Sequence, residues 1–193
     1  VSGAMAILYF ITYFAFALYG LIPQLAAFSI MVVFTVFTVI AALQYSRQII
    51  AHIGLVGAYA GPFLLSDGSG KVAVLFSYMA ILNIGILAIA LKKYWKALYF
   101  VSFGLTWLIF LSWYIVQFQP TEHFELAFVF LSLFFVIFYL TFLGYKLLQK
   151  EKFDVPDVIL VIINSFIFYG LGFSLLDDHQ TGKELLGVFT LVN

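Results

Sequence analysis

One short segment of the sequence gathers residue types that could bind a ligand inside a membrane. It covers residues 49–66 and contains His52, Tyr59 and Pro62. A histidine in an apolar run can carry a proton or contact a solute, and a proline leaves a backbone carbonyl without its helical donor. Broken helices at membrane depth often line a cavity. These three residues are therefore candidates for lining a ligand site or a passage.

The same segment carries three glycines at helical spacing. At about 100° per residue, Gly54, Gly57 and Gly61 fall within roughly 60° of one another and form a smooth face. Such a face lets a neighbouring helix approach closely, so helix packing is the simpler explanation of the glycines. Tyr59 projects from the opposite face, which leaves its role as a ligand contact open.

Two asparagines lie near the middle of other apolar runs. Asn83 falls within residues 72–91 and Asn164 within residues 157–176. Amides at this depth usually bond across helices, each contributing about 0.6–2 kcal/mol. The alternative is a polar contact for a substrate at the midplane, so both asparagines are also candidate ligand-lining residues.

The sequence carries no motif for catalysis or for a cofactor. It has no cysteine, which removes disulfides, thiolate nucleophiles and cysteine-ligated metals. Acidic and histidine side chains in the connections are of metal-ligating type but lack any motif spacing; they are Glu122, His123, Glu125, Asp177, Asp178 and His179. We predict no catalytic residue, no metal site and no cofactor.

These few polar residues are set in an extremely apolar chain. Of 193 residues, 65% are hydrophobic and 9% are charged, whereas soluble proteins carry about 25% charged residues. Nine Lys and Arg balance nine Asp and Glu, so the chain lacks the net charge and the basic stripe that nucleic-acid binding needs. We exclude nucleic acid as a partner and take the lipid bilayer as the solvent.

Apolar runs of bilayer-crossing length follow one another along the sequence. A span needs about 20 mostly apolar residues. Seven runs fit, and an eighth begins near Leu185; the seven cover about 1–22, 25–44, 49–66, 72–91, 97–118, 124–148 and 157–176. Backbone groups in lipid must bond internally, and the runs lack strict alternation, so helices are favoured over a barrel. The sequence predicts an all-α, polytopic transmembrane helical bundle of about seven spans plus the start of an eighth, in one domain over residues 1–193.

Both ends of the sequence cut into apolar runs. Residue 1 is valine, and the eighth run stops at Asn193. We expect a fragment of a longer membrane protein. Its expected partners are membrane lipids, the rest of the same chain and further copies in a homo-oligomer.

Basic residues predict the orientation, because cytoplasmic loops carry an excess of Lys and Arg. If all seven runs cross, one side has only Lys71 and Lys183, and the other side has seven basic residues: Arg47, Lys92, Lys93, Lys96, Lys146, Lys150 and Lys152. If residues 49–66 dip in and return, the division weakens to six against three. We therefore favour crossing, with the loops that contain Arg47, Lys92 to Lys96 and Lys146 to Lys152 in the cytoplasm.

Several stretches carry a resemblance to a known family. They read VSGAMAILYFITY at 1–13, HIGLVGAYAGPFLLS at 52–66, YMAILN at 78–83 and KKYWK at 92–96. In this order they resemble a large family of predicted bacterial multi-pass membrane proteins classed as a domain of unknown function, most like its Bacteroidota-type members. The resemblance implies an integral protein of the bacterial inner membrane, and it supplies no catalytic or binding residues.

Three hypotheses for function follow. The leading one is a non-enzymatic transport or binding module for an uncharged or amphipathic solute or lipid, because no ionisable group except His52 lies within a span. One alternative is a membrane enzyme that acts on a lipid-linked substrate through loop carboxylates such as Glu122 or Asp177. The other is a purely structural membrane scaffold.

Overall fold

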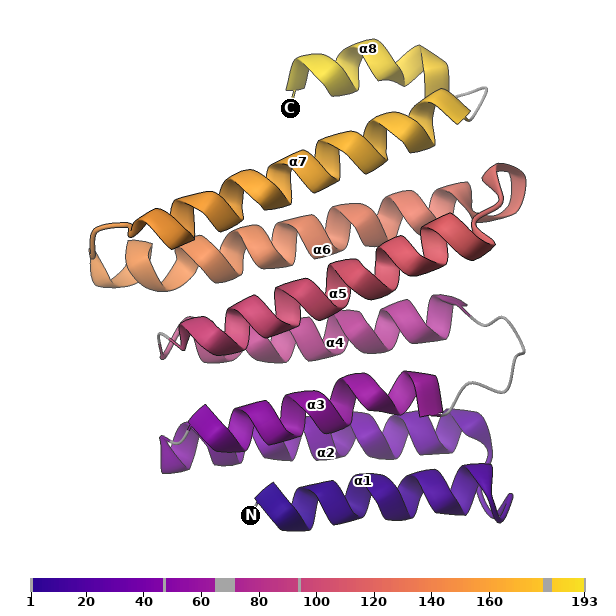
Figure 1. The fold of residues 1–193 in the computed structure, drawn as a ribbon, viewed down its shortest axis with the longest axis vertical. Coiled ribbons are helices and arrows are strands. Elements are labelled where there is room, and N and C mark those ends of the chain that lie inside the picture. The colour runs from indigo at the N-terminus through magenta and orange to yellow at the C-terminus, as the bar shows by residue number, and fades with distance from the viewer. Residues whose placement is uncertain (1, 47, 65–71, 94, 179–181, 193) are drawn as a thin grey trace. The chain divides into compact units, whose positions relative to one another are not determined.

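The computed structural model describes residues 2–46, 48–64, 72–93, 95–178 and 182–192. These residues form helices and no strand, which confirms the predicted all-α fold (Figure 1). The helices are α1 (Ser2–Ala17), α2 (Gln24–Tyr45), α3 (Gln48–Leu64), α4 (Val72–Ala90), α5 (Lys96–Gln117), α6 (Pro120–Gln149), α7 (Val155–Asp178) and α8 (Gly182–Val192). Arg47, His179 and the expected turn at 67–71 lie outside the described residues.

Five of these helices are long and apolar enough to cross a membrane. They are α2, α4, α5, α6 and residues Val155–Asp177 of α7. By helix length and composition, the prediction of seven spans is not supported. The helices α1 and α3 have 16 and 17 residues, whereas about 20 residues are needed to cover the hydrocarbon core. The first apolar run extends to residue 22, but its helix ends at Ala17 and Gly20 adopts a left-handed φ of 58°. The structure describes 11 residues of α8, and no span is assigned to them.

The chain divides into two compact units, with the boundary inside α5. Unit 1 is Val1–Leu105 and unit 2 is Thr106–Asn193. Each unit is described separately below.

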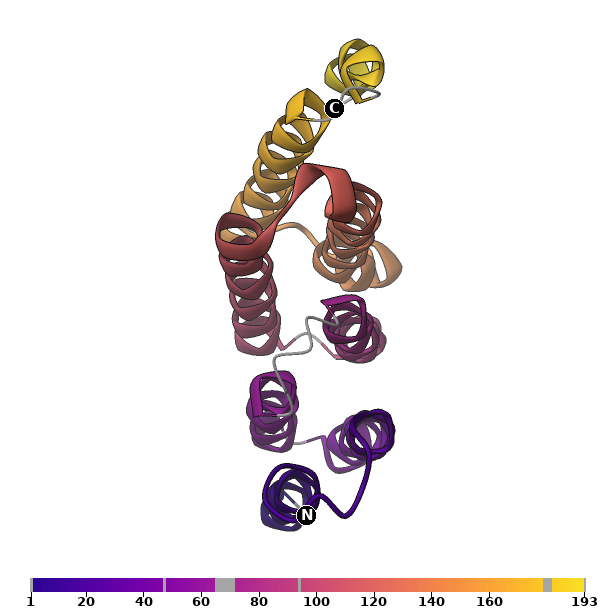
Figure 2. The ribbon, with the colours of Figure 1, turned by 90° about the vertical axis from the view of Figure 1, so that its right-hand side faces the viewer.

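In unit 1, α2 is the central helix. It packs against α1, α3 and α4, while α1 and α3 also contact each other. Figure 2 shows α1, α2 and α3 nearly end on, as three neighbouring helices. Phe76 and Met79 of α4 and Met31 of α2 are fully buried in this unit. Close packing of such side chains supplies the van der Waals contacts that hold helices together where lipid removes the hydrophobic effect.

In unit 2, α6 packs against α7, and α7 packs against α8. Buried aromatic rings connect the end of α5 to α6: Phe110 lies edge-on to Phe134 with ring centroids 6.1 Å apart, and Trp107 lies edge-on to Phe134 at 6.5 Å. At the other side of α7, the ring of Phe189 occupies the space where a Cβ on Gly172 would lie. Gly172 therefore provides the recess that seats α8 on α7.

The turn between α6 and α7 is held by an ionic cluster, here called the α6–α7 clamp, made of Lys146, Asp154 and Asp157. The ammonium of Lys146 lies 3.4 Å from a carboxylate oxygen of each aspartate and donates to the carbonyl of Lys152 at 2.7 Å. Lys146 and Asp157 are 4% and 5% exposed. The Asp157 carboxylate also accepts the backbone N–H of Asp154 at 3.1 Å, which caps the start of α7. The sequence placed these charges at helix ends but did not predict their pairing.

Candidate functional site

The glycine face of α3 meets two helices. A Cβ on Gly54 would collide with the methyl group of Thr38 on α2, and a Cβ on Gly57 would lie 3.3 Å from the ring of Tyr9 on α1. The absence of side chains at these positions therefore sets how closely α3 approaches its neighbours. The surroundings of Gly61 and Pro62 lie outside the described part of the structure, although the backbone of α3 stays helical as far as Leu64.

Tyr59 and Asn83, two of the candidates from the sequence, lie together in unit 1. The Tyr59 hydroxyl donates to the Asn83 side-chain oxygen at 2.6 Å and lies 3.4 Å from the backbone carbonyl of Ser102. Tyr59 is 3% exposed and Asn83 is fully buried. This polar contact joins α3, α4 and α5 in the interior of the unit.

His52 makes a local contact instead. Its Nδ1 lies 3.0 Å from the carbonyl of Gln48, one turn earlier in α3, and its ring is half-buried. This geometry holds the imidazole along its own helix.

Asn164 belongs to unit 2, where it bonds between α7 and α6. Its Nδ2 donates to the carbonyl of Phe135 at 3.0 Å. Its oxygen is buried and has no hydrogen-bond partner among the described residues. The arrangement is an interhelical bond of the kind that joins membrane helices.

Three further polar residues of unit 1, which the sequence did not single out, extend the buried polar region. The Tyr9 hydroxyl lies 2.7 Å from that of Thr35, which itself donates to the carbonyl of Met31 at 2.9 Å. Tyr78 on α4 is 2% exposed; its hydroxyl interacts with the Thr35 side chain and lies within electrostatic reach of Tyr9 and Tyr59. Among the described residues, no donor or acceptor lies in close hydrogen-bond geometry with that hydroxyl. Scattered tyrosines and threonines in the apolar runs gave no signal that these side chains would meet.

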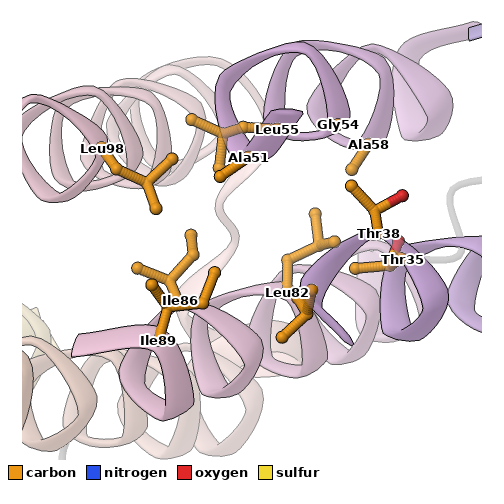
Figure 3. Close-up of a pocket in the computed structure, with 11 residues that line it drawn as sticks. Thr35, Thr38, Ala51, Gly54, Leu55, Ala58, Leu82, Ile86, Ile89 and Leu98 are labelled. Carbon is orange, nitrogen blue, oxygen red and sulfur yellow. The ribbon is translucent and has the colours of Figure 1, made fainter. Parts of the chain in front are cut away.

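Beside this polar region, α2, α3 and α4 and the start of α5 enclose a cavity (Figure 3). Its lining residues are Thr35, Thr38, Val39, Ala51, Gly54, Leu55, Ala58, Leu82, Ile86, Ile89 and Leu98. In Figure 3 the side chains of Leu55, Ile86 and Leu98 converge on the same space. Thr35 belongs both to the lining and to the polar region, so it connects the two.

The cavity is small and mostly apolar. Its volume is about 30 Å³, about one fifth of an engineered cavity of about 150 Å³ that binds benzene. Thr35 and Thr38 are the polar lining residues, and each hydroxyl already donates to a carbonyl of its own helix, at 2.9 Å and 2.8 Å. A buried water needs two to four polar partners, so the site favours a small apolar group over water.

None of the lining residues is ionisable. Within the described ranges no three His, Asp or Glu side chains come together in a way that could hold a metal ion. The chemistry available at this site is therefore hydrogen bonding from hydroxyl and amide groups and van der Waals contact.

The long apolar helices expose apolar side chains on their outer surface, such as Ile115 and Leu25, which are 79% and 72% exposed. The polar region of unit 1 lies in the interior. These features define a multi-pass helical membrane protein. The chain belongs to the family described as "Predicted membrane protein (DUF2339)", which matches residues 1–190. This match confirms the membrane family of unknown function predicted from the sequence motifs, while the Bacteroidota detail stays a prediction. No curated protein and no solved structure matches the chain.

Proposed function

We propose that unit 1 is a membrane-embedded binding module for an uncharged or amphipathic solute or lipid, and that the module serves transport or retention of that molecule. The observation that carries this proposal is the cavity lined without any ionisable group, whose lining residue Thr35 also interacts with the buried Tyr78 hydroxyl. An apolar space accepts apolar atoms, and a buried hydroxyl favours a ligand group that can complete its hydrogen bond.

A charged ligand does not suit this site. Placing an isolated charge in an apolar interior costs many kcal/mol unless it is paired, and the lining residues offer no counter-ion. Neutral chains, neutral polar groups and the apolar parts of lipids avoid that cost.

We also propose that α1 and α3 cross the bilayer, which gives seven spans in the bacterial inner membrane. At 1.5 Å per residue, their 16 and 17 residues reach about 24–26 Å, and a bilayer accommodates a short span by local thinning at a modest cost. Both helices pack against α2, a candidate span of 22 residues. The seven-to-two division of basic residues then places the loops with Arg47, Lys92 to Lys96 and Lys146 to Lys152 in the cytoplasm.

The test is to purify the full chain in native lipid and to identify retained molecules by mass spectrometry. Ala51→Phe fills the cavity, because Ala51 is buried in its lining. Val56→Phe is the matched control, because it adds bulk on the same helix at a residue that is 63% exposed.

We expect the wild type and Val56→Phe to retain the same neutral or amphipathic species and Ala51→Phe to lose it. The proposal fails if all three proteins, eluting alike on size exclusion, retain identical molecules in identical amounts.

A further inference from the structure

The turn between α4 and α5 carries positive charge that carboxylates do not balance. Unit 1 contains five Lys and Arg but a single acidic residue, Asp67. Asp67 precedes α4 in the chain, whereas Lys92 and Lys93 follow it, and the 19 residues of α4 make a helix about 28 Å long. Among the described residues, neither Lys92 nor Lys93 forms an ion pair. The turn therefore presents two lysines without a counter-ion.

Hydrogen bonds fix the backbone of this turn. The N–H groups of Lys92 and Lys93 donate to the carbonyl of Ile89 at 3.0 and 2.8 Å. The hydroxyl of Tyr99 accepts the N–H of Trp95 at 2.9 Å and donates to the carbonyl of Lys93. Tyr99 is 3% exposed. A buried side chain of α5 thus holds the turn, so a ligand that binds there has little backbone left to order.

The turn also borders apolar surface. It joins α4 to α5, which are both candidate spans, so it lies where a bilayer meets water. Trp95 has the kind of ring that is common at headgroup level. Leu91, just before the turn, and Phe100, in the second turn of α5, are each 39% exposed. Charge and apolar surface are therefore adjacent here.

These features define the chemistry of a ligand. The C-terminus of α4 and the N-terminus of α5 carry opposite partial charges, so the lysines determine the sign of the site. An anionic phospholipid offers a phosphate group at the depth of the lysines and acyl chains for the apolar surface. Inorganic phosphate matches the charge but leaves the apolar surface without a partner.

We propose that Lys92 and Lys93 bind the headgroup phosphate of an anionic phospholipid whose acyl chains lie along α4 and α5. The ammonium groups supply charge-assisted hydrogen bonds to the phosphate oxygens. This lipid site is separate from the cavity, so the inference goes beyond the proposed solute-binding function and does not depend on it.

The experiment titrates the full chain, in a non-ionic detergent, with phosphatidylglycerol and with phosphatidylcholine of the same acyl chains. Phosphatidylglycerol is anionic, whereas phosphatidylcholine has no net charge. Native mass spectrometry gives the dissociation constant of the first bound lipid. We expect phosphatidylglycerol to bind several-fold more tightly. Lys92→Gln/Lys93→Gln should weaken its binding by roughly fivefold for each lysine removed and leave phosphatidylcholine unchanged.

Lys150→Gln/Lys152→Gln is the matched control. It also removes two exposed lysines, but from a loop that contains the carboxylates of Glu151 and Asp154. It should keep the preference for phosphatidylglycerol. Equal losses in the two double variants would show that the lipid responds only to overall charge, which would overturn the proposal.

Two further measurements test the lysine turn itself. Lys92→Arg/Lys93→Arg keeps both charges and should keep the wild-type affinity. Size exclusion and thermal unfolding show which variants are folded. If Lys92→Gln/Lys93→Gln does not fold, Lys92→Gln, at an exposed position, takes its place and should weaken binding by roughly fivefold. Wild-type affinity in the folded glutamine variant would overturn the proposal.

Competition identifies the source of the phosphate and separates this site from the cavity. Inorganic phosphate should not displace phosphatidylglycerol at equal concentration. Displacement would assign the turn to a soluble phosphate and overturn the lipid proposal. Ala51→Phe, which fills the cavity, should leave the affinity for phosphatidylglycerol unchanged. A loss in Ala51→Phe as large as that in Lys92→Gln/Lys93→Gln would contradict a separate lipid site.

Discussion

At the scale of single residues, two buried tyrosines of unit 1 differ in whether their hydroxyl groups form a close hydrogen bond. Tyr59 donates to Asn83 at 2.6 Å, whereas no donor or acceptor among the described residues lies in close hydrogen-bond geometry with the Tyr78 hydroxyl. Removing a group that forms a hydrogen bond lowers the free energy of unfolding. Removing a buried polar group that forms no hydrogen bond instead relieves a desolvation cost. The two hydroxyls should therefore have different effects on stability.

We predict that Tyr59→Phe lowers the free energy of unfolding by about 1 kcal/mol, the usual range for a polar contact between membrane helices. Tyr78→Phe should leave it unchanged or raise it, because it removes a hydroxyl without breaking a close hydrogen bond. Unfolding in mixed detergent micelles measures both, with Tyr45→Phe, a residue 59% exposed, as the control. Equal losses from Tyr59→Phe and Tyr78→Phe would mean that the Tyr78 hydroxyl forms a close hydrogen bond in the folded protein.

At the scale of elements, the α6–α7 clamp fixes how one helix leads into the next. The left-handed Lys150 ends α6, with the N–H of Glu151 bonded to the Lys146 carbonyl at 3.0 Å, an arrangement typical of helix C-termini. Asp154 then precedes α7, and Lys146 reaches across to both aspartates. The turn thus combines a helix stop, a helix start and an ion pair within a few residues.

We predict that Lys146→Met destabilises the full chain by about 3 kcal/mol, the lower end of the range for breaking a buried ion pair. The lower end applies because Asp154 is 52% exposed and water partly solvates its carboxylate. Lys150→Met, at an exposed position, should change stability by less than about 0.5 kcal/mol. Unfolding in detergent tests both, and hydrogen exchange localises the change.

Faster exchange should appear at the end of α6 and the start of α7 in Lys146→Met. A loss of stability in Lys150→Met as large as that in Lys146→Met would contradict the assigned role of the clamp, because it would show that the loss of any positive charge in this loop has the same effect.

The elements show how far the sequence alone could lead. Charge and turn clusters delimited the apolar runs well, so residues 72–91 and 97–118 correspond to α4 and α5 within one residue at each end. The first run was misjudged because composition does not reveal that the helix stops at Ala17 and that Gly20 turns the chain. Helix length, on which the count of long apolar helices depends, is set by such local backbone geometry.

The candidate site was only partly predictable. Asn83 and Tyr59 could be selected because each is a hydrogen-bonding residue in an apolar run, but their contact joins residues 24 positions apart. The pairing of Tyr9 with Thr35, over 26 positions, and the cavity depend on which helices become neighbours. A single sequence does not show which helices contact one another.

At the scale of the whole molecule, the proposed orientation has a direct test. The chain contains no cysteine, so a single introduced cysteine reports one position without background. Ser46→Cys lies in the proposed cytoplasmic turn after α2, and Thr121→Cys lies at the proposed outward end of α6; both residues are exposed.

In intact cells, a membrane-impermeant maleimide should label Thr121→Cys and leave Ser46→Cys unlabelled until the membrane is permeabilised. The reversed pattern would invert the orientation. Labelling of both positions in intact cells would show that α3, α4 and α5 together cross an even number of times, which would rule out the model in which all three span.

The α6–α7 clamp also bears on which lipids the protein can gather around itself. Lys146 has its ammonium group occupied by two carboxylates and a backbone carbonyl and is 4% exposed. Its charge still counts in the sequence rule that orients helices during insertion, but in the folded protein it is withdrawn from the phosphate headgroups of anionic lipids. The attraction of this loop for such lipids then depends on the exposed Lys150 and Lys152, and it is weakened further by the half-exposed carboxylate of Asp154.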